Sequence, residues 1–462
     1  MSTAPIALES IQRCLEGVIP SPLATCSADG VPNITYVSVV RYVDAERIAL
    51  SRQFLRKTAA NVDENPVAQV LVVDPETLDQ YALDLRYLHT ETEGPLFDSM
   101  KANLDAVASH TGIGRDVFRL RGVDVHRVVA CRRIGRDPEP VRARGHALDP
   151  LKALDDFVRR VGESVDYDEA TQIALQALED VFGWRHAILL GAADGAERLF
   201  GVASNGYAAS PAGAEVALGE GMIGLAAQRR RLICVSNLAR SRVMGSAVQE
   251  RVSRTAGAPG PPREIALPGL ERPQSAAAVP LVVHGALVGV LYLESERPGA
   301  FGPHDERLLR IVGGHLAAAL SALAHGHDTA EAAVAAPAPG PAPGAALEIT
   351  YYQADDSVFA GGDYVIKGVP GRILWKLLRE HAADGRTAFT NRELRLDEGL
   401  GLPAGNDNLE ARLVALRRRL AAGDWGIALE RVARGRMALR VSRPLTLAEV
   451  PTSGPMRAAH ER

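Results

Sequence analysis

Apolar and polar residues alternate in three different ways along this chain, and each way predicts a different kind of packed unit. Through residue 135, short β-rich runs are separated by turn sequences such as Ala28-Asp29-Gly30, which is typical of a β-barrel built from hairpins. From residue 150 to 325, two helical patterns precede several strands and a long closing helix. From residue 347 to 445, strand-like pieces lead into helices and end in a hairpin. These patterns predict a multidomain α+β chain.

Proline, glycine and alanine mark the boundaries between the three units. The segment 326–346 contains the Ala/Pro/Gly-rich run Thr329–Ala346, which is almost uncharged and predicts a semi-extended tether. At Gly135–Pro150, strand patterning gives way to helical patterning. The irregular stretch Arg254–Ser275 is followed directly by strand-like sequence, so we interpret it as a loop inside the middle unit. The predicted domains are therefore 1–135, 150–325 and 347–445.

Composition narrows the classes of partner and the compartment. The 462-residue chain has a formal net charge of −4, so any surface that binds nucleic acid must be local. The four cysteines, Cys14, Cys26, Cys131 and Cys234, form no CxxC pair, which argues against a zinc site and favours reduced thiols in a cytosolic protein. The N-terminus lacks a signal-peptide pattern, and no run approaches the roughly 18 apolar residues of a membrane span. We therefore expect a cytoplasmic protein without a membrane partner.

The first unit contains a candidate phosphate site at the start of a short helix. Arg56 and Lys57 open the predicted helix Arg56–Glu64, where free N–H groups and the positive end of the helix dipole favour an anion. The run LATCSADGVPNITYVSVVRYVDAERIALSRQFLRKTAANVDENPVAQVLVV resembles the FMN-binding split barrels of the pyridoxamine 5′-phosphate oxidase type. The resemblance implies that Arg56 and Lys57 bind the flavin phosphate, with Ser51 and Gln69 on the flanking strands.

Two departures limit what this resemblance implies about chemistry. Leu55 stands where the family often has serine, and the Arg-rich substrate motif of the oxidase is absent, so catalysis on a vitamin B6 phosphate is not expected. Such barrels also hold haem or a deazaflavin, or nothing. The alternative is that Arg56 and Lys57 are ordinary solvated charges. Further along, His89, Glu91 and Glu93 share one face of a predicted strand, which is more typical of a polar outer face than of a metal site.

The middle unit carries the features of a small-molecule sensor module. The runs GEGMIGLAAQRRRLICVSN and AAAVPLVVHGALVGVLYLESERPGAFGPHDERLLRIVGGHLAAAL resemble a GAF domain, an α/β sandwich. The resemblance implies either binding of a small molecule beneath a variable loop or dimerisation, and a homodimer is expected. The Asn-Lys-Phe-Asp-Glu signature of cyclic-nucleotide binding is absent, and Ser236-Asn237 replaces a frequent aspartate. Cys234 lies within an apolar strand, which favours a buried structural thiol over a covalent bilin.

The third unit contains the most regular helical pattern of the chain. Leu409, Leu413, Leu416 and Leu420 form one apolar stripe along Asn408–Ala422. Before it, Thr390 and Glu393 have the spacing of a capping box, and after it two strand-like runs flank Arg434-Gly435-Arg436. This order resembles the OmpR-type winged helix, in which the third helix reads DNA and the hairpin forms the wing. The resemblance implies DNA contacts by arginines of the helix and the wing, namely Arg412, Arg418, Arg419, Arg434 and Arg436.

The local charge of this unit favours DNA as a partner, whereas two apolar residues of the helix argue against it. Residues 348–444 hold 16 Lys and Arg and 13 Asp and Glu, a local charge of +3 in an otherwise acidic chain. Val414 and Ala415, however, stand where base-reading polar residues are frequent. Arginines alone position a protein on phosphates without specifying sequence. The alternative is a winged helix that serves protein contacts.

Three functions follow from this domain order. The first is a cytosolic ligand- or redox-responsive transcriptional regulator, with a flavin-type barrel, a GAF relay and a DNA-binding output. The second is a flavin-dependent oxidoreductase with a regulatory GAF domain, although the sequence offers no general acid or base to place beside a flavin. The third is a non-enzymatic scaffold. A regulator without enzymatic activity accounts for most of these features.

Overall fold

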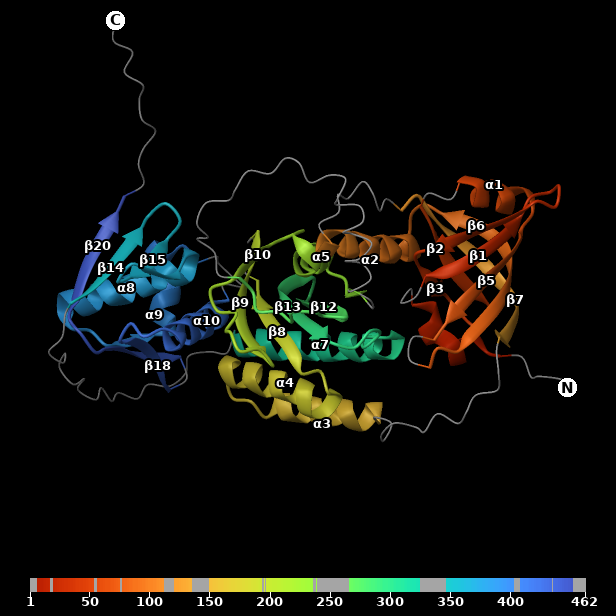
Figure 1. Ribbon diagram of the computed structural model, residues 1–462. Coiled ribbons are helices and arrows are strands. Elements are labelled where there is room, and N and C mark those ends of the chain that lie inside the picture. The colour runs from red at the N-terminus through yellow and green to blue at the C-terminus, as the bar shows by residue number, and fades with distance from the viewer. Residues whose placement is uncertain are drawn as a thin grey trace, which may run out of the picture.

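The computed structural model shows three units in a row, with the N-terminal barrel at one end and the C-terminal unit at the other (Figure 1). The described residues are 6–16, 20–53, 56–74, 77–111, 120–134, 149–192, 195, 197–235, 238, 266–324, 346–402, 408–433 and 435–451. The predicted boundaries at Gly135–Pro150, Arg254–Ser275 and Thr329–Ala346 lie largely outside these residues.

The N-terminal unit is a curved sheet of seven antiparallel strands in the order β2-β1-β5-β6-β7-β4-β3. Its strands are β1 (Ser21–Cys26), β2 (Pro32–Val37), β3 (Val40–Tyr42), β4 (Arg47–Arg52), β5 (Val67–Val73), β6 (Gln80–Glu91) and β7 (Gly122–Ile134). Its helices are the 3₁₀ helix η1 (Leu8–Leu15), α1 (Arg56–Glu64) and α2 (Pro95–Thr111). Alternate residues point inward, as in β1, where Leu23 is buried.

Several expected elements of this unit are confirmed, and two are shifted. The hairpin around Gly30 and the helix Arg56–Glu64 form as predicted. The β-rich run Pro32–Val40 predicts one strand, but the structure has β2 and β3 with a break at Ser38-Val39. The run Phe118–Val123 predicts a closing strand; Phe118 and Arg119 lie outside the described residues, and strand β7 covers Gly122–Ile134. Its thirteen residues pair with both β6 and β4, so long-range pairing decides its position.

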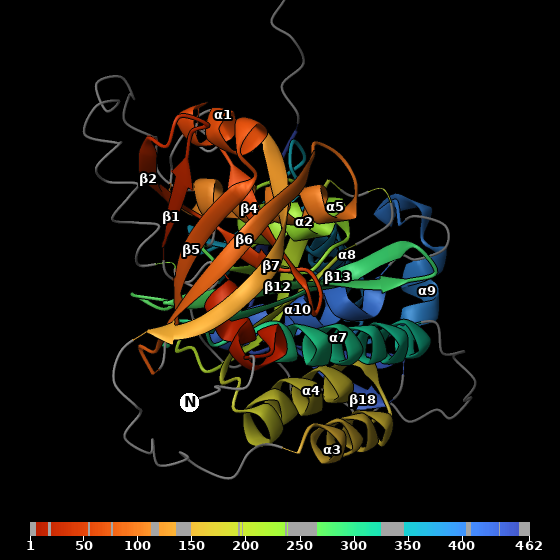
Figure 2. The same cartoon turned by 90° about the vertical axis from the view of Figure 1, so that its right-hand side faces the viewer.

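The middle unit is a six-stranded antiparallel sheet in the order β10-β9-β8-β13-β12-β11. Its strands are β8 (His186–Gly191), β9 (Arg198–Asn205), β10 (Glu215–Ala217), β11 (Ile233–Val235), β12 (Ser275–Val283) and β13 (Ala286–Ser295). Its helices are α3 (Pro150–Gly162), α4 (Tyr167–Phe182), α5 (Gly221–Arg229) and α7 (Pro303–Ala324). Figure 2 shows α7, α4 and α3 stacked beneath the sheet.

Phe157 of α3 packs at the centre of this helical layer, against both α4 and α7. The side chain is fully buried and packs against Phe182 and His315. We predict that Phe157→Ala destabilises the middle unit by about 3–5 kcal/mol, because the cavity left behind cannot collapse completely. The neighbouring Val158→Ala is the control, since Val158 is 37 % exposed, and it should cost less than about 1 kcal/mol. Chemical denaturation followed by circular dichroism measures both, and equal losses would contradict this account.

Helix α7 is long and apolar enough, by length and composition over His304–Ala324, to cross a membrane. In the structure its apolar face packs on the sheet, and Leu309, Val312 and Leu320 belong to the buried core. We interpret α7 as a core helix of the middle unit.

The C-terminal unit has two small sheets around its helices. The first has the order β16-β15-β14-β20 and the second β17-β19-β18. Its strands are β14 (Leu347–Tyr352), β15 (Ser357–Ala360), β16 (Asp363–Ile366), β17 (Ala388–Thr390), β18 (Ile427–Ala433), β19 (Arg436–Val441) and β20 (Leu445–Val450). Its helices are α8 (Gly368–Asp384), α9 (Asn391–Leu396), the 3₁₀ helix η2 (Glu398–Leu400) and α10 (Leu409–Ala422).

Local signals predicted the helices of this unit well. Thr390 caps α9 by accepting a hydrogen bond from the Glu393 N–H at 3.2 Å. The leucine stripe of α10 lies in the core of this unit, as expected. The sequence did not predict β15, β17 or β20. Strand β20 pairs in parallel with β14, which lies about a hundred residues earlier in the chain. No local turn signal can therefore predict this strand.

Candidate functional site

The predicted phosphate site lies where β4 passes into α1. Arg56 and Lys57 are both exposed at the first turn of α1, whereas Thr58 behind them is buried. Ser51 is buried near the end of β4, where its Oγ accepts a hydrogen bond from the Val39 N–H at 3.3 Å. The two cations are thus presented to solvent at a helix N-terminus, which is a suitable arrangement for a phosphate. Leu55 lies outside the described residues.

Gln53, two residues after Ser51, is a site candidate that sequence reasoning missed. The side chain is only 7 % exposed, and its Oε1 accepts a hydrogen bond from the Ser38 hydroxyl at 3.4 Å. Its Nε2 is buried without a hydrogen-bond acceptor among the described residues. A buried donor without an acceptor is costly, and a bound ring that carries carbonyl oxygens would satisfy it. The sequence signal was its place between Ser51 and the Arg56-Lys57 pair.

His126 on β7 is a second buried polar group of the barrel. Its Nδ1 contacts the Asp124 carbonyl at 3.1 Å, and its ring packs edge-on against Tyr87. Its Nε2 is buried without a partner among the described residues. Burial lowers the pKa of His126, which favours the neutral ring. Neutral imidazole is both a hydrogen-bonding group and an axial ligand for haem.

Gln69 does not join the group around Ser51. It lies on β5 with its side chain exposed, and its Nε2 donates to Asp84 at 2.6 Å. Asp84 also accepts from Arg132 at 3.1 Å. Strands β6 and β7 separate β5 from β4 in the sheet. Ser51, Gln53, Arg56 and Lys57 are close in sequence where β4 passes into α1, whereas the Gln69 side chain belongs to a polar cluster with Asp84 and Arg132.

Helix α10, the predicted recognition helix, packs between the C-terminal unit and the middle unit. Its leucine stripe faces the core of its own unit, whereas Ala411 and Val414 belong to the core of the middle unit. Val414 is 4 % and Ala415 2 % exposed. Val414 thus packs on the neighbouring unit, and Ala415 lines a cavity between the two units, which accounts for apolar residues at both positions. A helix that is apolar on two faces is buried on two faces.

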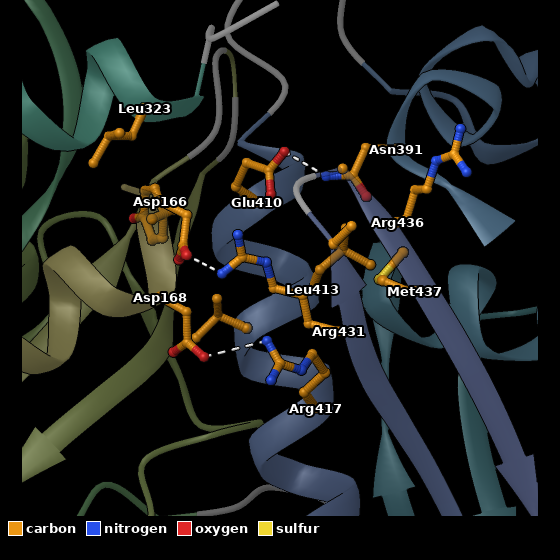
Figure 3. A pocket seen from close by; sticks show the side chains of 14 residues that line it. Asp166, Asp168, Leu323, Asn391, Glu410, Leu413, Arg417, Arg431, Arg436 and Met437 are labelled. Atoms are coloured by element: carbon orange, nitrogen blue, oxygen red, sulfur yellow. Dashed lines mark hydrogen bonds and ion pairs between the residues drawn. The ribbon is translucent and has the colours of Figure 1, made fainter. Parts of the chain in front are cut away.

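Ion pairs hold the same helix on the N-terminus of α4 (Figure 3). Asp168 accepts from Arg417 at 3.2 Å and from Arg418 at 2.9 Å. Asp166 pairs with Arg431 of β18 and also caps α4 by accepting from the Glu169 N–H at 3.0 Å. The carboxylates are less than a fifth exposed, so water screens these pairs less than it screens pairs on an open surface. We call this contact surface, formed by α10 and β18 on one side and α4 and β9 on the other, the α10 interface.

Asn408 fixes the start of α10 on the middle unit. Its side chain is 1 % exposed, and its Nδ2 donates to the carbonyls of Ala192 and Val288, the latter at 3.2 Å. Ala192 directly follows β8, and Val288 lies in the first half of β13. In the sequence, Asn408 marks only the first residue of a predicted helix. The local sequence does not show whether its side chain caps that helix or bonds to another unit.

Three of the five arginines predicted to contact DNA, Arg412, Arg418 and Arg419, contact other protein groups in this arrangement. Arg412 is 7 % exposed and lies over the ring of Phe200, 5.3 Å from its centre. Arg418 pairs with Asp168. Arg419 donates to the carbonyls of Val365 at 2.7 Å and Tyr364 at 2.8 Å. These hydrogen bonds join α10 to β16 within the C-terminal unit. Arg436 lines a cavity of about 40 Å³ at the α10 interface, and Arg434 lies outside the described residues.

A second interface joins the barrel to the middle unit. Arg41 of β3 lies 3.8 Å from Glu306 of α7. Glu16, at the end of η1, lies near both residues, and burial raises its pKa to about 8, with Arg41 opposing the shift and Glu306 adding to it. Cys234 is buried in the core nearby, and burial raises its pKa well above the usual value. This confirms the expected buried thiol.

Glu16 should make the stability of the chain depend on pH. Its pKa of about 8 in the folded state exceeds the ordinary value of 4.5, so the folded state holds a proton that the unfolded state has released. Stability therefore falls as the pH rises from about 4.5 through 8. We predict that Glu16→Gln flattens the melting temperature over this range and that the variant exceeds the wild type most above pH 8. Parallel pH profiles for the two proteins would contradict this assignment.

The face of the middle sheet beneath α5 contains a buried carboxylate. Glu294 is 7 % exposed and accepts hydrogen bonds from Tyr207 and Tyr292, each at 3.0 Å, and from the Leu270 N–H at 2.8 Å. These contacts satisfy the carboxylate within the protein. In the part of the chain that the structure describes, no group of three or more His, Cys, Asp or Glu side chains gathers as a metal site.

Comparison with known families identifies the first two units. Residues 7–128 match the model of the pyridoxamine 5′-phosphate oxidase family, and residues 164–321 match that of the GAF domain. The chain therefore carries a domain of the pyridoxamine 5′-phosphate oxidase type followed by a GAF domain, within a multidomain α+β architecture. Neither model extends into the C-terminal unit. No curated protein matches the chain.

Solved structures resemble single domains of the chain. The GAF domain of an Acinetobacter phosphoenolpyruvate-protein phosphotransferase is 22 % identical, covers 40 % of this chain and 99 % of its own, and has a TM-score of 0.31. An FMN-binding protein from Syntrophomonas wolfei is also 22 % identical, covers 28 % and 93 %, and has a TM-score of 0.23. The free methionine-R-sulfoxide reductase of Neisseria meningitidis is 19 % identical, covers 38 % and 89 %, and has a TM-score of 0.29.

Proposed function

We propose that this protein is a cytosolic transcriptional regulator in which a flavin-type barrel and a GAF domain control a winged-helix, DNA-binding output. The observation that carries the proposal is the α10 interface. The helix expected to read DNA packs directly on the GAF domain through Val414 and through the pairs made by Asp168. A change in the GAF domain that weakens these contacts would free the helix. This is a physical link between sensor and output.

The order of elements in the C-terminal unit supports the winged-helix assignment. A sheet precedes α8, α9 and α10, and the hairpin of β18 and β19 follows them. The hairpin is in the position expected of a wing. A helix fits the major groove of DNA once its outer face is exposed. In the proposed function, the docked arrangement is the state in which α10 is withheld from DNA.

The barrel supports a flavin-type cofactor. Arg56 and Lys57 would hold the phosphate at the N-terminus of α1, and the buried Gln53 Nε2 would donate to a ring carbonyl. When bound, FMN supplies reversible electron transfer, and the residues of this chain position it. A homodimer is part of this proposal.

The test is DNA binding by the full chain in gel-shift assays on genomic fragments over a range of salt concentrations. We expect weak complexes that dissociate steeply as salt rises, because arginine contacts to phosphate release counterions. Arg419 is unsuitable for mutation in this test, since its contacts with Val365 and Tyr364 are structural. If neither the wild type nor a variant with a weakened α10 interface binds DNA, the proposal fails.

A second function, a scaffold that works by protein contacts, is favoured by one observation. The outer face of α10 is apolar at Ala411, Val414 and Ala415 and is covered by protein. In a scaffold this contact is permanent, and its removal would destabilise both units without creating DNA affinity.

A further inference from the structure

A cavity of about 410 Å³ lies where the GAF domain meets the C-terminal unit. The GAF domain contributes Arg198, Phe200 and Glu215 to its wall, and the C-terminal unit contributes Lys367, Pro370 and Arg412. Small-molecule sites have volumes of about 300–1,000 Å³. This cavity therefore has the size of a ligand site. Its wall is formed by two units that meet here through non-covalent contacts.

The charged groups of the cavity favour an anion. Glu215 pairs with Arg198 at 2.9 Å and with Lys367 at 3.4 Å, so that one carboxylate joins cations from both units. Arg412 adds a guanidinium group that is more than nine-tenths buried. With Glu197, the wall carries three cations and two carboxylates. Arginine and lysine in a partly desolvated site bind phosphate strongly.

The start of α8 faces the same cavity. Lys367 is the N-cap residue of this seventeen-residue helix and pairs with Glu215 of the GAF domain at 3.4 Å. Val369 and Pro370 of its first turn line the cavity. The Gly368 N–H donates to the Asp355 carbonyl at 3.1 Å and Pro370 has no N–H, so this terminus contributes chiefly the positive end of the helix dipole to the attraction of an anion.

The remaining wall is largely apolar. Phe200, Val369 and Pro370 offer a surface for a planar ring, and the guanidinium of Arg412 already stacks on Phe200. A phosphate joined to a flat ring system satisfies both parts of the cavity. A nucleoside monophosphate has this chemistry and fits the volume.

We propose that this cavity binds a nucleoside monophosphate or a molecule of the same chemical class and that the bound ligand holds the C-terminal unit on the GAF domain. Both units supply contacts, so the ligand binds the docked arrangement more tightly and shifts the population toward it. Its consequence for DNA, lower affinity when the ligand is bound, rests on the proposed function. Binding itself does not.

The test is calorimetric titration of the full chain with AMP, with adenosine as the control that lacks the phosphate. We expect AMP to bind and adenosine to bind at least about tenfold more weakly. The Lys367→Ala and Arg198→Ala substitutions should each lower the affinity for AMP by about tenfold. Arg159→Ala is the matched control, because Arg159 pairs with Asp156 and Glu163 of its own helix and lines neither this cavity nor the α10 interface, and it should leave AMP affinity within about threefold of the wild type.

Hydrogen exchange of the α10 amides provides the second readout. We expect AMP to slow exchange in α10 in the wild type and not in Lys367→Ala. Absence of AMP binding, or equal binding by all variants, overturns the proposed site. AMP binding without a change in α10 exchange overturns the docking effect. Either result can be obtained without DNA, so failure of this inference is distinguishable from failure of the DNA-binding proposal.

Discussion

Asp168→Arg is expected to release the C-terminal unit from the GAF domain. Asp168 accepts from both Arg417 and Arg418, so the substitution removes two ion pairs and places three guanidinium groups together. For pairs that are about one-fifth exposed, we expect a loss of about 2 kcal/mol, between the values for surface and buried pairs. That corresponds to a shift of about thirtyfold toward the released form. Small-angle scattering should show a larger radius of gyration, and α10 should exchange its amide hydrogens faster.

The control for this prediction is Asp156→Arg. Asp156 lies on α3 and pairs with Arg159 of the same helix, away from the α10 interface. Its reversal should leave the scattering profile unchanged. A second variant that combines Asp168→Arg with Arg417→Asp and Arg418→Asp should restore docking. If Asp168→Arg leaves both the radius of gyration and α10 exchange unchanged, these pairs do not hold the interface.

Arg56→Ala with Lys57→Ala is expected to weaken FMN binding by at least about a hundredfold. Each cation makes a charge-assisted contact worth about 1.5–3 kcal/mol, and together about 3 kcal/mol or more corresponds to this factor. Riboflavin lacks the phosphate, so its affinity should change little in the same variant. Titration followed by quenching of flavin fluorescence measures both ligands.

Arg127→Ala is the matched control for the flavin prediction. Arg127 is exposed on β7 of the same barrel but lies away from α1. The Arg127→Ala variant should bind FMN with the affinity of the wild type. A wild-type protein that binds no FMN, or a double variant that loses riboflavin and FMN equally, would contradict the phosphate assignment. A haem spectrum in the purified protein would point to His126 in place of Arg56 and Lys57.

Local sequence signals predicted most of the fold and part of the site. Helices α1 and α10 were predicted within one residue of their observed bounds because spacing and capping are local properties. The family resemblance implies a place for Gln69 in the flavin site, but its hydrogen bond to Asp84 depends on which strand lies beside β5, and the sequence does not show that. Gln53 was missed because its importance comes from burial, which a short polar segment does not reveal.

The interdomain contacts were beyond prediction for a related reason. In the sequence, Val414 and Ala415 stand where base-reading residues are expected, whereas in the structure Val414 packs in the core of the middle unit and Ala415 lines the cavity between the units. An apolar residue on the second face of a helix indicates that a partner covers it but does not identify the partner. Asp166 and Asp168 likewise read as ordinary acidic residues at a helix start, and only the folded arrangement brings Arg431, Arg417 and Arg418 to them.

The most direct test of the account compares DNA affinity of the wild type, Asp168→Arg and Asp156→Arg in one salt-controlled gel-shift series on genomic fragments. If α10 is a DNA-reading helix withheld by the GAF domain, Asp168→Arg binds DNA at least about tenfold more tightly than the other two proteins, in line with its released population. If Asp168→Arg releases the C-terminal unit in scattering and still binds DNA no better than the wild type, α10 does not read DNA and the regulator account is wrong.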